Sequence, residues 1–194
     1  MSNSATYTEM LSGLESHEER EVTPNAALFE ALGQGQSPKV ALVTCSDSRI
    51  DPCAMTGTKP GDIFVIRNAG NIVPPSTGGE LASLEFAIFG LKVEHIVVCG
   101  HSQCGAMKGL MNPDSCASLS HVSAWVKHAG DALKVLESDD SGDTLAMVTE
   151  ENVRLQMRNL MELDFVRQGI EAGSLQVHGW VYDVGTGKTK VLAE

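Results

Sequence analysis

Short apolar segments recur along the chain, separated by polar or glycine-containing stretches. Residues 40–43, 62–66 and 95–99 are dominated by valine, isoleucine, leucine and phenylalanine. Apolar runs of this length are typical of strands that are buried on both faces of a parallel sheet. Two later runs, residues 175–182 and 188–192, are joined by a turn that contains glycine. Such a turn favours a hairpin, so we expect the last strand to lie antiparallel at one edge.

The segments between these strands carry the spacing of helices. Helical patterns are predicted over residues 80–91, 103–111, 119–137 and 145–171. Because strands alternate with helices, we expect an α/β fold with a mostly parallel central sheet, an antiparallel edge strand and flanking helices.

An amphipathic arm precedes the first strand. Residues 5–20 are polar apart from an apolar stripe at helical spacing, and residues 26–32 predict a second short helix. The chain has 194 residues with 42% hydrophobic content, which suits a single domain. We therefore expect one domain over residues 1–194, with residues 1–35 as an N-terminal helical arm.

Composition excludes several classes of protein. The formal net charge of −11 argues against binding to nucleic acid. No apolar stretch approaches the roughly 20 residues that span a membrane, and the start of the chain lacks the pattern of a signal peptide. We expect a soluble, cytoplasmic protein. Five cysteines are an odd number for such a chain and favour metal binding or free thiols over disulfides.

Two motifs carry the candidate chemistry. Cys45 follows the first predicted strand, and His101 follows the third, with Cys104 three residues further on at a helix start. In open α/β sheets, sites form beyond the carboxyl ends of strands where the strand order reverses. Two cysteines and one histidine are a typical three-ligand zinc set that leaves a fourth position open. We also expect the helix N-terminus to lower the pKa of Cys104.

Asp47 and Arg49 lie beside the first cysteine. Zinc held by two thiolates and a neutral imidazole has no net charge, so it acidifies water weakly and benefits from an accessory group. Arg49 can hold Asp47 in a bidentate ion pair and keep it ionised. If that pair opened, Asp47 could reach the metal and close the site. The spacing thus permits both a catalyst and a switch.

These residues resemble a known family. Residues 45–49 and 101–105, together with residues 61–71, 106–109 and 177–182, are similar to the β-class carbonic anhydrases, in particular to the plant and cyanobacterial members. The resemblance spans nearly the whole chain.

The resemblance implies a function and an assembly. It implies one Zn²⁺ per chain held by Cys45, His101 and Cys104, with Asp47 and Arg49 as the catalytic dyad that orients zinc-bound hydroxide. The implied reaction is the reversible hydration of carbon dioxide to bicarbonate and a proton, which makes the protein a lyase. It further implies a homodimer, or a higher homo-oligomer of dimers, in which residues 1–35 embrace the partner.

Two residues next to the first motif depart from a regulated branch of the family. Members with a non-catalytic bicarbonate pocket usually carry tryptophan and glycine where this chain has Leu42 and Thr44. We therefore predict the open subtype, which lacks that pocket and keeps Asp47 on Arg49.

Two alternatives remain. One is a hydrolase of carbon disulfide or carbonyl sulfide on the same scaffold, and the other is a non-enzymatic zinc-binding or redox-sensing protein.

Other polar and aromatic residues are expected to have structural roles. Arg67 and Asn68 are predicted to brace the loop after their strand, and Trp125 is predicted to be a packing residue. The remaining cysteines are expected to be incidental thiols: Cys53, Cys99 and Cys116.

Overall fold

The computed structural model describes residues 6–76, 78–137 and 142–192. The chain divides into two compact units, Met1–Gln36 and Ser37–Glu194. The first unit is helical. Its α1 (Tyr7–Glu15) begins with a capping box, in which the Thr6 hydroxyl accepts from the backbone N–H of Glu9 and the Glu9 carboxylate accepts from that of Thr6.

A π-helical turn (Glu18–Val22) and a 3-10 turn (Thr23–Asn25) follow α1 and lead into α2 (Ala26–Leu32), which has the bounds expected from the sequence. None of the residues of α1 is buried, and the apolar stripe predicted for the arm is exposed, with Leu14 at 72%.

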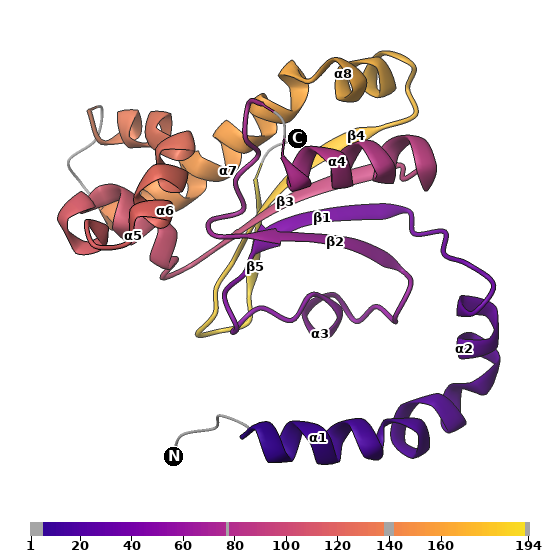
Figure 1. Ribbon diagram of the computed structural model, residues 1–194. Helices are drawn as coiled ribbons and strands as arrows, with labels where there is room; N and C mark the ends of the chain where they lie inside the picture. The colour runs from indigo at the N-terminus through magenta and orange to yellow at the C-terminus, as the bar shows by residue number, and fades with distance from the viewer. Residues whose placement is uncertain (1–5, 77, 138–141, 193–194) are drawn as a thin grey trace. The chain divides into compact units, whose positions relative to one another are not determined.

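The second unit is built on a five-stranded sheet in the order β2-β1-β3-β4-β5 (Figure 1). The first four strands are parallel, and β5 pairs antiparallel with β4, as the hairpin pattern predicted. The bounds are β1 (Val40–Cys45), β2 (Ile63–Asn68), β3 (His95–His101), β4 (Gln176–Tyr182) and β5 (Thr189–Leu192). The first three strands each extend two residues beyond the predicted end, because backbone pairing continues past the apolar run.

Helices connect and cover these strands. They are α3 (Pro52–Thr56), α4 (Gly79–Glu85) with a π-helical turn (Phe86–Gly90), α5 (Gly105–Met111), a 3-10 turn (Pro113–Cys116), α6 (Ser120–Trp125), a 3-10 segment (Val126–Glu137), α7 (Thr144–Glu162) and α8 (Asp164–Glu171).

Two predictions of a single long helix are wrong, because each segment forms two separate elements. The helix expected over 119–137 is α-helical only as far as Trp125, and Gly130 weakens helix propensity in the 3-10 part. The helix expected over 145–171 breaks at Leu163, which is extended. The break lets α8 direct Val166 into the core that Leu160 of α7 also enters.

Side chains of alternate strand residues face opposite layers. Val43 and Val98 pack with α4, α7 and α8 on one face of the sheet, while Leu42 and Val97 pack with Met55 of α3 on the other (Figure 1). The chain leaves β1 toward β2 on one side and leaves β3 toward β4 on the other. The strand order therefore reverses between β1 and β3, which places a crevice at their carboxyl ends.

Candidate metal centre

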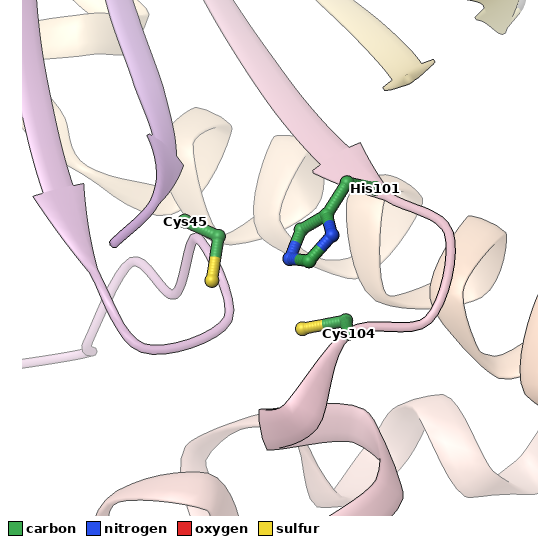
Figure 2. Close-up of side chains that lie close together, drawn as sticks. All are labelled: Cys45, His101 and Cys104. Atoms are coloured by element: carbon green, nitrogen blue, oxygen red, sulfur yellow. The ribbon is translucent and has the colours of Figure 1, made fainter. Parts of the chain in front are cut away.

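The three predicted ligand residues meet at this crevice (Figure 2). Cys45 is the last residue of β1, His101 is the last residue of β3, and Cys104 is the N-cap residue of α5. Their donor atoms all lie within 4.8 Å of one another. All three side chains are buried, with exposed fractions of 6%, 0% and 1%. Within the part of the chain that the structure describes, no other group of three such residues comes together.

The imidazole of His101 is oriented for a metal. Its Nδ1 lies 2.9 Å from the carbonyl oxygen of Ser102, so the Nδ1 proton is donated there and Nε2 carries the lone pair. Nε2 is fully buried and has no hydrogen-bond partner among the described residues. A buried nitrogen without a partner is costly unless a ligand satisfies it. Together with two sulfurs nearby, this orphaned atom fits a bound Zn²⁺.

The two thiols interact directly. The neighbouring Cys104 thiol lowers the pKa of Cys45, and the backbone N–H of Gly70 donates to the Cys45 sulfur at 3.3 Å. The pKa of Cys104 is raised, first by the Cys45 sulfur and then by burial.

The expectation that the helix N-terminus lowers the pKa of Cys104 is confirmed as a contribution, although the net pKa is raised. The N–H groups of Ala106 and Met107 act in that direction, but the neighbouring sulfur outweighs them. A divalent cation held by Cys45 and Cys104 would remove this competition, since a coordinating thiol is deprotonated outright.

The carboxylate of Asp47 is held by Arg49. The guanidinium Nε and Nη2 donate to the two carboxylate oxygens at 2.8 and 2.7 Å, and the Arg49 backbone N–H donates at 3.0 Å. These bonds hold the pKa of Asp47 well below its usual range. Asp47 Oδ2 lies 3.8 Å from Nε2 of His101, so an ionised carboxylate borders the ligand atoms.

The loop after β1 is braced from β2. Arg67 donates from Nε to the carbonyl oxygen of Cys45 at 2.9 Å and from Nη2 to that of Asp47 at 2.7 Å. The Asn68 side chain bonds both the N–H and the carbonyl oxygen of Ile72, each at 2.8 Å. The prediction that these residues brace the loop after their own strand is confirmed for Asn68, whereas Arg67 instead holds the loop after β1, the segment that carries the first ligand.

Sequence reasoning missed part of the surroundings. Trp125, predicted to be a packing residue, donates its indole N–H to the carbonyl oxygen of Ala69 at 2.8 Å. Asn152, for which no role was predicted, donates to the carbonyl oxygen of Gly70 at 3.0 Å. A tryptophan N–H in a packed environment usually finds a hydrogen-bond partner, so the sequence did indicate that Trp125 would donate to some acceptor.

The other thiols stand apart from the centre. Cys99 is fully buried, and burial raises its pKa to about 11. Cys116 is buried and Cys53 is half-buried.

Comparison with known proteins agrees with this geometry. The family model described as carbonic anhydrase matches residues 40–189. A carbonic anhydrase of Synechococcus elongatus is 44% identical over 169 residues, which cover 83% of this chain and 62% of that protein. The chain belongs to the β-carbonic anhydrase family.

Solved β-carbonic anhydrases have the same fold. The structure of β-carbonic anhydrase CcaA superposes with a TM-score of 0.92 at 37% identity, covering 96% of this chain and 94% of that one. A structure from work on two tetrameric β-carbonic anhydrases of the fungus Sordaria macrospora gives a TM-score of 0.85 at 30% identity, covering 97% of each chain. The chain spans only 62% of the length of the Synechococcus relative. No helix in the described residues is long and apolar enough to cross a membrane.

Proposed function

We propose that this chain catalyses the reversible hydration of carbon dioxide to bicarbonate and a proton. The observation that carries the proposal is the buried Cys45, His101 and Cys104 group with an unpartnered Nε2, bordered by a carboxylate that arginine keeps ionised. Membership of the family supports the same reaction.

Each residue has a defined role in this proposal. Cys45, His101 and Cys104 hold one Zn²⁺, which when bound supplies the Lewis acidity that lowers the pKa of water. Asp47 accepts a hydrogen bond from the attacking water and so orients it toward carbon dioxide. Arg49 occupies both carboxylate oxygens and prevents Asp47 from turning onto the metal.

We also propose that bicarbonate does not regulate the activity, on the basis of two residues of β1. Leu42 and Thr44 are buried, and the Thr44 hydroxyl donates to the carbonyl oxygen of Cys99 at 3.0 Å. These filled and satisfied positions support the prediction of an open subtype without a second bicarbonate pocket. A bicarbonate titration of the activity tests it, and cooperative inhibition at low pH would contradict it.

We also propose that the protein is a homo-oligomer in which residues 1–35 cover a second copy. Tyr7, Met10, Leu11 and Leu14 of α1 are all exposed in the single chain, and such an apolar stripe needs a partner surface. A cytoplasmic location stays a prediction from the sequence, and cell fractionation tests it.

The activity is tested by stopped-flow carbon dioxide hydration with metal-quantified protein. Asp47→Asn is expected to lower kcat by about 10²–10⁴-fold without changing zinc content. Asp51→Asn is the matched control, since Asp51 caps α3 and asparagine caps equally well.

The alternatives give different results in the same assay. Wild type with one zinc per chain but no hydration of carbon dioxide would refute the proposal. Turnover of carbon disulfide in its place would favour the hydrolase. If the chain is a non-enzymatic zinc-binding or redox-sensing protein, Asp47 is dispensable and Asp47→Asn should behave like the wild type.

A further inference from the structure

One peptide group lies between Trp125 and the sulfur of Cys45. The Trp125 indole N–H donates to the Ala69 carbonyl oxygen at 2.8 Å, and the Gly70 N–H donates to Cys45 Sγ at 3.3 Å. That oxygen and that N–H belong to the same trans peptide, in which they point in opposite directions. The indole therefore approaches one side of the peptide and the sulfur lies on the other.

Such a chain of hydrogen bonds is cooperative. A donor at the carbonyl oxygen polarises the peptide and strengthens the hydrogen bond that its N–H donates. Gly70 and Cys45 are both buried, so water does not compete for the hydrogen bond between them. A hydrogen bond to a thiolate withdraws electron density that the sulfur otherwise gives to a metal.

The loop that contains this peptide is held in place by α7. Asn152 donates to the Gly70 carbonyl oxygen at 3.0 Å, and Gln156 donates to the Asn152 side-chain oxygen at 2.8 Å. The Gln156 oxygen in turn accepts from the N–H of Val73 at 2.9 Å. Both amide side chains are fully buried. The loop cannot move away from Cys45 without breaking these buried bonds.

The backbone conformation of Gly70 also helps its N–H to reach the Cys45 sulfur. Its φ of +85° is in the left-handed region, and a Cβ there would lie 2.9 Å from the Cβ of Ala106. Only glycine places its N–H toward the sulfur at this position.

We propose that Trp125 is a positioning residue of the metal centre, which tunes Cys45 as a ligand through the Ala69–Gly70 peptide. The inference rests on the proposed function only in taking Cys45 as a zinc ligand.

The test is Trp125→Phe, which keeps most of the ring and removes the N–H. In protein loaded with Co²⁺ in place of zinc, the sulfur-to-cobalt charge-transfer band is expected to move to longer wavelength, because the sulfur electrons are less stabilised. Zinc affinity, measured by competition with a chelator, is expected to fall by about tenfold, because the loop against Cys45 loses the hydrogen bond from Trp125 that helps to orient it.

The matched control is Trp180→Phe. Trp180 is the other tryptophan of the chain and packs with Leu42, Val97 and Cys99, away from this loop. The Trp180→Phe substitution is expected to leave the charge-transfer band and the zinc affinity unchanged. A folded Trp125→Phe protein with an unchanged band and an unchanged affinity would overturn the proposal.

If Trp125→Phe does not fold, the wild type loaded with cadmium-113 gives the answer. Nuclear magnetic resonance should detect a coupling between the Gly70 amide proton and the metal nucleus through the sulfur, and its absence would equally overturn the proposal. Wild type that binds Co²⁺ through sulfur but does not hydrate carbon dioxide would refute the proposed function and leave this inference standing.

Discussion

Gly100 precedes the ligand His101 and lies under α7, which makes Gly100→Ala a sharp test of how the site is built. A Cβ at Gly100 would lie 2.7 Å from Cγ2 of Val153 and 3.5 Å from Cγ2 of Thr149. Ordinary carbon–carbon contact is about 3.5–4.0 Å, so Val153 and the new methyl group must separate by roughly 0.8 Å. Val153 and Thr149 are both buried, with exposed fractions of 0% and 2%.

The side chains around the new methyl group have little room to move. Valine in a helix has one strongly preferred rotamer, so Val153 cannot simply turn away. Either α7 or the end of β3 must shift, and the second movement displaces His101. Overpacking of a filled core costs about 1–3 kcal/mol, and we expect a loss of about 2 kcal/mol in the free energy of unfolding.

Urea unfolding followed by tryptophan fluorescence measures this loss, at fixed protomer concentration and fixed free zinc. Gly105→Ala is the matched control because Gly105 also adjoins a ligand, Cys104. A Cβ at Gly105 would meet no heavy atom within 4 Å. Since Gly105 begins a helix, alanine there should be neutral or stabilise by up to about 1 kcal/mol.

A double variant checks the cause. Val153→Ala removes the atom that clashes, so Gly100→Ala combined with Val153→Ala should be more stable than the sum of the single effects by about 0.5–3 kcal/mol. Strict additivity, or a Gly100→Ala protein as stable as Gly105→Ala, would refute the reasoning.

Four further outcomes are expected. Free Zn²⁺ at 100 times its dissociation constant should raise the free energy of unfolding by about 2.7 kcal/mol, and a chelator should reverse this in thermal scans. Asn68→Ala leaves the N–H and the carbonyl oxygen of Ile72 without their partner, so thermal denaturation should show a loss of about 1–3 kcal/mol. Because the pKa of Asp47 is lowered by folding, its stabilising effect is complete above its unfolded pKa of about 3.9 and is lost as pH falls below it. The stability difference between wild type and Asp47→Asn should therefore stay constant from about pH 8 to 5 and shrink only below about pH 4, as urea titrations will show. Mass spectrometry after brief alkylation at about pH 8 should find Cys53 modified and Cys99 intact, since burial raises the pKa of Cys99 to about 11.

The sheet and the ligand set could be predicted because their signals are local or follow from topology. Apolar runs marked the strands, and Cys45 and His101 come where two of those runs end. The reversal of strand order between β1 and β3 then brings these residues together. By contrast, no glycine or proline marks the break at Leu163, so periodicity alone continued one helix across it.

The surroundings of the ligands could not be predicted in the same way, because backbone groups provide them. Gly70 offers an N–H to Cys45, and the carbonyl oxygen of Ser102 orients His101. Any residue has these groups, so residue identity does not show which of them will face a ligand. The side chains that hold the loop are distant in sequence: Trp125 lies 56 residues from Ala69, and Asn152 lies 82 residues from Gly70.

The strength of zinc binding can vary without any change in the ligand motif. The Cys-His-Cys motif decides whether a metal can bind, whereas the packing of α6 and α7 around the loop after β2 decides how the first sulfur is hydrogen-bonded. Substitutions in α6 or α7 can therefore change the electron density that Cys45 donates while every residue of the motif stays the same. Two chains with identical ligand motifs need not hold zinc equally tightly, and Trp125 and Asn152 are the positions at which to look for the difference.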